Sequence, residues 1–156
     1  MFENADLLHR YTRAQAIADG VLIDVSATAQ EAGFRYPVAL TAAVWAKCVT
    51  VPQGVECQDE AGRLWDVLWL LRCAVGRGNG AVIRFAVHVR NDNRDCTPPL
   101  VRLKALCGPD DDGEPCITVL LPDQDSNRIL QLPILIILYG KRPFLALQTP
   151  VQFRLQ

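Results

Sequence analysis

The feature that most constrains the fold of this chain is a series of three segments in which apolar and polar residues alternate. The segments span residues 82–90, 100–107 and 116–121, and they follow a first half that reads mostly as helix. A period of two places successive side chains on opposite faces of a β-strand. The segments therefore predict a sheet with one polar face and one apolar face that other elements must cover.

The polar positions of the first two predicted strands are basic. They are Arg84, His88 and Arg90 in the first strand and Arg102 and Lys104 in the second. Like charges that meet across neighbouring strands destabilise a sheet, so solvent, acidic side chains or a polyanionic ligand should offset them. One interpretation is an anion- or nucleic-acid-binding face that contacts phosphates. The other is a sheet face that is simply solvated, and the face has no aromatic residue on which bases could stack.

Helix signals dominate the first half of the chain. Thr12 and Gln15 have the spacing of a capping box and predict a short helix that Gly20 ends. An apolar run at residues 21–25 suits a strand, and Ser26 is expected to cap a helix that reaches Ala32. The alanine-rich residues 39–49 predict a third helix.

The clearest predicted helix begins at Asp59 and Glu60. Its apolar residues recur at helical spacing and form a broad stripe, namely Leu64, Trp65, Leu68, Trp69 and Leu71. This stripe is the best candidate to cover the apolar face of the predicted sheet. Trp65 and Trp69, together with Trp45 of the preceding helix, are expected to anchor the core rather than to form a ligand pocket.

These elements predict an α+β fold in which three to four helices pack on one face of a mostly antiparallel β-sheet. Half of the 156 residues are apolar, so the chain can form a sizeable core. Residues 1–125 are expected to form one domain. Residues 126–156 have no acidic residue and four basic ones, hence a formal charge of +4, and this apolar extension is expected to add strands to the same domain.

A cluster of acidic residues occupies the predicted turn between the second and third strands. It consists of Asp110, Asp111, Asp112 and Glu114. Three consecutive aspartates do not match the alternating ligands of a calcium-binding loop. A solvated turn is the favoured interpretation, and contact with a basic protein partner is the alternative.

No residue pattern predicts a catalytic, metal or cofactor site. Asp24 and Ser26 lie where a strand passes into a helix, but no histidine is near in sequence to complete a triad. Cys48, Cys57 and Cys73 lack the context of a nucleophile. No cysteine pair has C-x-x-C spacing, so a zinc site is not expected, and Cys107 and Cys116 are expected to be small apolar side chains even if they face each other across strands.

Three segments resemble a family of bacterial proteins of uncharacterised function. The segments are YTRAQA at 11–16, DEAGRLWDVL at 59–68 and GPDDDGEP at 108–115, and the similarity covers residues 8–125. Members of this family are often carried on plasmids, phages and integrated conjugative elements. The resemblance implies a mobile-element setting, in which small accessory proteins often counter host defences, as anti-CRISPR and antirestriction proteins do. It implies no activity and no site residue.

Together these observations favour a small non-catalytic binding protein over an enzyme. A protein or nucleoprotein partner is expected. The alternative is a nucleic-acid-binding module that uses the basic sheet face. A third hypothesis is a small enzyme of unknown chemistry. The net charge of −1 gives no overall attraction to DNA or to acidic membranes. Because neither a secretory signal nor a membrane span is evident, the expected location is the cytoplasm.

Overall fold

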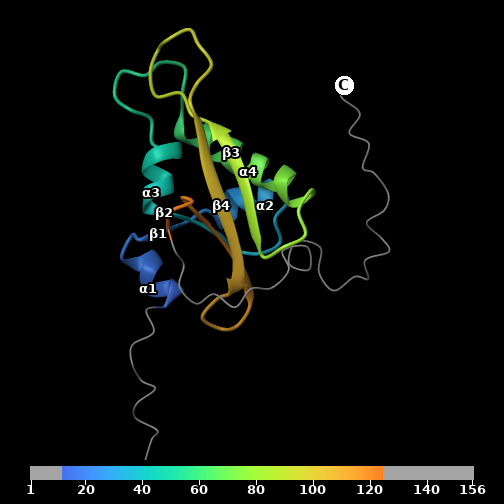
Figure 1. Cartoon of the computed structure of the whole chain (residues 1–156). Coiled ribbons are helices and arrows are strands. Elements are labelled where there is room, and N and C mark those ends of the chain that lie inside the picture. The colour runs from blue at the N-terminus through green and yellow to red at the C-terminus, as the bar shows by residue number, and fades with distance from the viewer. Residues whose placement is uncertain (1–11, 125–156) are drawn as a thin grey trace, which may run out of the picture.

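The computed structural model describes residues 12–124 of the chain (Figure 1). Its elements are α1 (Arg13–Ala18), β1 (Leu22–Asp24), α2 (Ser26–Glu31), β2 (Val38–Thr41), α3 (Ala42–Val44), the π-helical η1 (Trp45–Val49), α4 (Glu60–Val75), β3 (Val82–His88), β4 (Leu100–Pro109) and β5 (Pro115–Leu120). The predicted extension at residues 126–156 and its additional strands lie outside the described residues.

The strands form one five-stranded mixed sheet in the order β1-β2-β5-β4-β3. The β1–β2, β5–β4 and β4–β3 pairs are antiparallel, whereas β2 and β5 are parallel. The predicted α+β class is therefore confirmed. The three alternating segments are β3, β4 and β5 with slightly shifted ends, and β3 is an edge of the described sheet.

The strand β2 corrects the prediction of a helix over residues 39–49. All residues of Val38–Thr41 are buried, between β1 on one side and β5 on the other. Alanine and leucine favour helix, but a short apolar run also suits a strand that is covered on both faces. The helix begins only at Ala42, where the Thr41 hydroxyl accepts a hydrogen bond from the Val44 amide at 3.3 Å.

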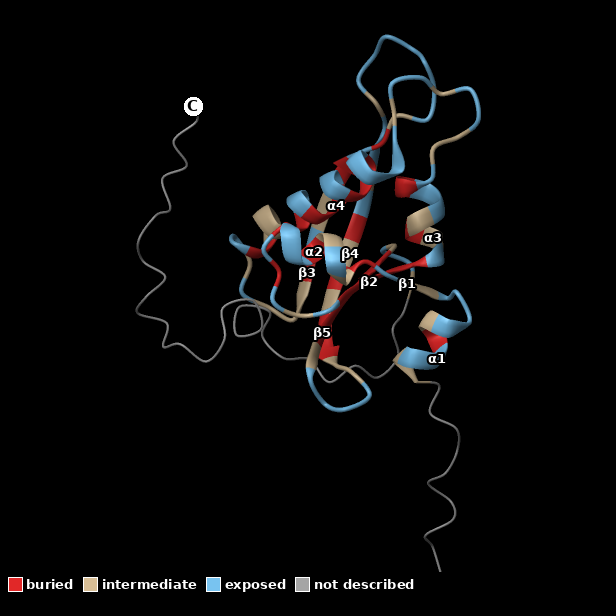
Figure 2. Ribbon diagram, turned by 180° about the vertical axis from the view of Figure 1, so that it is seen from behind, coloured by how far each residue is buried: buried red, intermediate tan, exposed pale blue. Residues whose placement is uncertain are grey.

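The hydrophobic core lies between α4 and the sheet, and α2 contributes to it. Leu68 and Leu71 of α4 and Ala29 of α2 belong to one buried cluster with Leu103 of β4 and Val119 of β5. In Figure 2 the buried side of α4 is turned toward the strands. Within residues 12–124, no helix is both long enough and apolar enough to cross a membrane.

The tryptophans of α4 do not fill this core, which corrects the prediction that they anchor it. Trp65 is 37% exposed and Trp69 is 40% exposed, and their stacked rings have centroids 6.3 Å apart. Each follows a buried leucine, and one residue along a helix rotates the side chain by about 100°. The two rings therefore lie on the flank of α4. Trp45, by contrast, packs against the core cluster while remaining partly accessible.

Helix α1 is fixed to β5 by side-chain hydrogen bonds. The predicted capping box is present, because the Thr12 hydroxyl accepts from the Gln15 amide and the Gln15 side chain accepts from the Thr12 amide. The Arg13 guanidinium donates to Thr118 Oγ1 at 2.7 Å and to the Ile117 carbonyl at 3.1 Å. Since Thr118 alternates with core residues of β5, Arg13 contacts the sheet on the face opposite to the core.

Candidate functional site

The register of β3 against β4 brings four of the predicted basic residues to one face of the sheet. Arg84 lies opposite Lys104, while Arg102 lies opposite Ala86 and His88 opposite Leu100. The intervening residues of β3, among them Ile83 and Val87, are buried in the core. We call Arg84, His88, Arg102 and Lys104 the cationic face.

Arg84 and Arg102 are the accessible charges of the cationic face. Both are exposed, and neither makes a hydrogen bond or an ion pair within residues 12–124. Because Arg102 is displaced by two positions from the residue opposite Arg84, the two arginines are diagonal neighbours, at a Cα separation of about 7–8 Å in a typical sheet. The described chain therefore supplies no counter-charge to either guanidinium.

The other two members of the cationic face are held by loop carbonyls. Lys104 Nζ donates to the Pro122 carbonyl at 3.1 Å. His88 Nδ1 lies 2.7 Å from the Pro98 carbonyl, and because a carbonyl can only accept, Nδ1 carries the proton in this contact. These contacts fix the positions of Lys104 and His88 and occupy part of their donor capacity.

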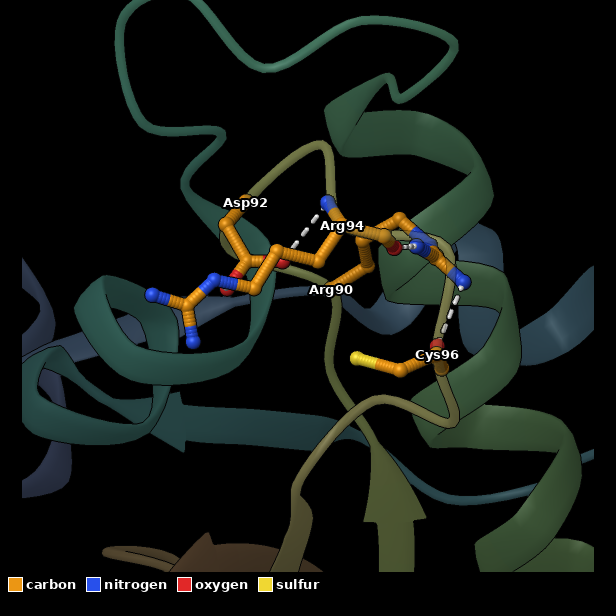
Figure 3. Close-up of polar contacts among 4 residues, drawn as sticks. All are labelled: Arg90, Asp92, Arg94 and Cys96. Carbon is orange, nitrogen blue, oxygen red and sulfur yellow. Dashed lines mark hydrogen bonds and ion pairs between the residues drawn. The ribbon is translucent and has the colours of Figure 1, made fainter.

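Arg90, the fifth predicted basic residue, organises a loop instead of joining the cationic face. It lies beyond the end of β3, and its guanidinium donates to the carbonyls of Arg94 and Cys96 (Figure 3). Asp92 completes this loop by accepting from the Arg94 amide at 3.1 Å. The Arg90 charge is thus directed into the loop at residues 89–99.

A buried arginine that sequence reasoning missed joins the same loop to the rest of the protein. Arg63 of α4 is only 5% exposed. Its guanidinium donates to Thr50 O at 2.9 Å, Asn91 Oδ1 at 3.0 Å, Gln58 Oε1 at 3.2 Å and to Arg90 O. All of these acceptors are neutral. Figure 1 shows the loops that they come from, 50–59 and 89–99, rising together at one end of the sheet.

Two carboxylates of the predicted acidic turn have structural partners. Asp111 accepts hydrogen bonds from the amides of Arg13 and Ala14 at 2.8 and 2.9 Å, at the N-terminus of α1. Asp110 accepts from the amides of Asp112 and Glu114 within the turn, both at 2.9 Å. Asp112 and Glu114 are exposed. The contact with a basic partner stays a prediction, and within the chain the turn positions α1.

Asp24 and Ser26 form a local turn. Asp24 Oδ1 accepts from the Ser26 amide at 3.0 Å and from the Ser26 hydroxyl at 2.5 Å. Ser26 begins α2 but does not cap it, because Val25 occupies the N-cap position without a side-chain hydrogen bond. His88 lies on β3, at the opposite edge of the sheet from β1. Within residues 12–124, the residues of a serine–histidine–aspartate arrangement are therefore not brought together.

The cysteines divide into buried and accessible thiols, and all six are free. Burial raises the pKa of Cys48 to about 11 and that of Cys107 to about 12, and it also raises the pKa of Cys116. Cys107 lies opposite Ile117 and Cys116 opposite Gly108, so the two thiols project to opposite faces of the sheet. No group of metal-ligating side chains is found among residues 12–124.

Burial of these thiols gives a testable dependence of stability on alkaline pH. The pKa of Cys107 rises from 9.0 to about 12, so its contribution to stability is complete below pH 9 and is lost as pH rises through 12. Urea unfolding measures the free energy of unfolding. Between about pH 8 and about pH 10.5, this free energy is therefore expected to fall further in the wild type than in a Cys107→Ala variant. A Cys57→Ser variant, which changes an exposed thiol, serves as the control. Equal losses in wild type and Cys107→Ala would contradict this assignment.

An open groove runs between the C-terminal half of α4 and the edge strand β3. Its volume is about 540 Å³. The apolar part of its lining includes Leu70, Cys73, Ala74, Ile83 and Phe85. Arg77 and Arg84 also line it, and none of the lining residues is acidic. Sequence reasoning missed this groove because nothing in the alternation of residues 82–90 shows that their strand forms a sheet edge.

The chain belongs to a family of unknown function, DUF6573, whose model matches residues 1–125. No curated protein and no solved structure matches the chain. The family match leaves the role of the cationic face and of the groove to be argued from the geometry.

Proposed function

We propose that this protein is a non-catalytic binding protein whose cationic face holds an anionic surface of a protein or nucleoprotein partner. The pair Arg84 and Arg102 carries the proposal: both are exposed, they are diagonal neighbours, and neither has a partner within the described residues. Lys104 adds a third positive charge directly opposite Arg84. A carboxylate or phosphate of the partner provides the counter-charge through charge-assisted hydrogen bonds.

The packing on the other face of the sheet supports this use of the cationic face. We propose that α2 and α4 together shield the apolar face, since both helices share the buried cluster with Ile83 and Leu103. The polar side of β3 and β4 then remains for a partner. Thr118 and Leu120 of β5 are buried on that same polar side, so β5 adds no accessible area beside β4.

A protein surface is favoured over single-stranded nucleic acid by the position of the two exposed tryptophans. Proteins that bind single strands stack bases on aromatic rings beside a basic groove. Here Trp65 and Trp69 lie on the flank of α4, whereas Arg84 and Arg102 lie on the sheet face that points away from the core beneath α4. Binding of a nucleic-acid backbone by the cationic face alone is the alternative function. Enzymatic chemistry is disfavoured because Asp24 and Ser26 engage each other and because burial raises the pKa of the Cys48, Cys107 and Cys116 thiols.

A host defence complex of the CRISPR or restriction type is the class of target that we propose. The support is the resemblance to proteins carried on mobile elements, together with the phosphate and carboxylate groups that a nucleoprotein complex presents to a cationic face. Expression of the protein in bacteria with an active defence of this type is expected to restore phage plating. A variant that lacks the Arg84 and Arg102 charges is expected not to restore it.

Affinity capture with the full chain tests the binding function. A protein or nucleoprotein held by the wild type is expected to be recovered at least tenfold less by an Arg84→Gln/Arg102→Gln variant, because each lost charge-assisted contact contributes about 1.5–3 kcal/mol. The control is Lys47→Gln/Arg94→Gln, which removes the same charge from two exposed residues outside the cationic face. Quantitative mass spectrometry of nuclease-treated and untreated eluates measures recovery and separates protein from nucleoprotein targets. If Arg84→Gln/Arg102→Gln and Lys47→Gln/Arg94→Gln recover equal amounts of the partner, the cationic face does not bind it.

A further inference from the structure

The outward edge of β3 carries main-chain hydrogen-bonding groups that the described chain does not use. In the β3–β4 ladder, the Cys107 amide donates to the Ala81 carbonyl and the Val89 amide donates to the Pro99 carbonyl. Odd-numbered residues of β3 therefore direct their main-chain groups toward β4. The amides and carbonyls of Arg84 and Ala86, halfway between, point away from β4. Since β3 is an edge of the described sheet, no strand among residues 12–124 pairs with them.

The groove beside this edge is partly apolar, and its charged residues are all basic. Leu70 is 37% exposed, and with Cys73 and Phe85 it contributes apolar lining. Arg77 and Arg84 also line the groove, and none of the lining residues is acidic. A strand laid beside β3 would alternate its side chains between this apolar lining and the cationic face.

We infer that β3 takes up an extended, acid-bearing segment of the partner protein as an additional antiparallel strand, with its apolar side chains in the groove beside α4. The inference rests on the proposed function and specifies the ligand of the same site. Main-chain hydrogen bonds to Arg84 and Ala86 supply register, as in other cases of strand addition to an exposed sheet edge. Acidic side chains on alternate positions meet Arg84 and, one strand further, Arg102.

Charge disfavours two occupants that the chain itself could provide, a second copy and residues 126–156. A second copy added through its own β3 would bring two Arg84 side chains into direct or diagonal cross-strand positions, and like charges there are destabilising. Residues 126–156 contain Arg128, Lys141, Arg142 and Arg154 but no acid, so they repeat the sign of the groove. We therefore propose an acidic segment from another protein, whose charge complements that of the groove.

Synthetic peptides test the inference without knowledge of the natural partner. The probe is an acetylated, amidated octapeptide in which glutamate alternates with valine. It is expected to bind the full chain at least tenfold more tightly than the same peptide with lysine in place of glutamate. N-methylation at the glutamate positions, whose amides would pair with β3, is expected to weaken binding at least tenfold, whereas N-methylation at the valine positions should change it less than threefold. Equal effects of the two N-methylation patterns would overturn strand addition.

A matched pair of protein variants tests the edge itself. Ala86→Pro removes one outward amide that the sheet does not use, and Ala86→Val retains it. Ala86→Pro is expected to weaken binding of the glutamate peptide at least tenfold, and Ala86→Val less than threefold. On binding, hydrogen exchange at the amides of Arg84 and Ala86 is expected to slow at least tenfold. Peptide binding without this protection would overturn the inference even if the proline variant fails to fold.

The outcomes separate this inference from the proposed function. If Arg84→Gln/Arg102→Gln loses the captured partner while Ala86→Pro keeps it, the cationic face binds and strand addition is wrong. Sedimentation provides a second check. If the wild type forms a dimer that Ala86→Pro does not form, the inference is also wrong, because a second copy would then occupy the edge. The inference would also be overturned if a single-stranded oligonucleotide displaces the peptide and binds Ala86→Pro as tightly as it binds the wild type.

Discussion

Replacement of Arg63 with methionine is expected to lower the free energy of unfolding by about 3 kcal/mol. Arg63 is buried and donates hydrogen bonds to four neutral acceptors in the loops at residues 50–59 and 89–99. Methionine preserves the apolar stem but leaves those acceptors without their donor. Chemical denaturation measures the loss, and hydrogen exchange in residues 50–59 and 89–99 should increase because both loops lose their common anchor.

The matched control is Arg72→Met on the same helix. Among residues 12–124, the Arg72 guanidinium makes one hydrogen bond, to the Gly33 carbonyl at 3.1 Å, and this contact is exposed. Its loss is expected to cost less than about 1 kcal/mol. If Arg63→Met and Arg72→Met destabilise the protein equally, the assignment of Arg63 as the link between the two loops is wrong.

Leu68→Ala is expected to destabilise the protein by about 3–4 kcal/mol, whereas Trp65→Ala should cost only about 1 kcal/mol. Leu68 is fully buried in the core cluster, and alanine there leaves a cavity. Trp65 is partly exposed and loses mainly its stacking on Trp69. Urea denaturation of both variants gives the comparison. The opposite order of the two losses would place the tryptophans in the core, as the sequence pattern predicts.

That prediction failed because the apolar stripe of α4 is wider than the surface that the core can cover. Leu64, Leu68 and Leu71 and the adjacent Trp65 and Trp69 all fit helical spacing. Spacing alone does not tell which part of a wide stripe faces the sheet. Elsewhere local patterns were sufficient: the capping box at Thr12 and the alternation in β3 and β4 have purely local causes. The strand β2 has a non-local cause, since its pairing with β5 decides between helix and strand.

The candidate site also combines features that follow from local sequence patterns with features that do not. Alternation was enough to place Arg84, Arg102 and Lys104 on one face. It could not show that Arg90 lies beyond the strand and turns to loop carbonyls, because loop conformation does not follow a period. The edge position of β3 and the groove beside α4 depend on the order of strands in the sheet, which no segment of the sequence contains by itself.

The central place of β5 has a consequence for synthesis of the protein on the ribosome. β5 comes last in the described chain, yet it lies between β2 and β4 and joins the two halves of the sheet. While the nascent chain is shorter than about residue 120, β2 has no neighbour on its β5 side and its apolar residues cannot be fully enclosed. We therefore expect acquisition of protease resistance to be abrupt and late during translation, and not to proceed helix by helix from the N-terminus.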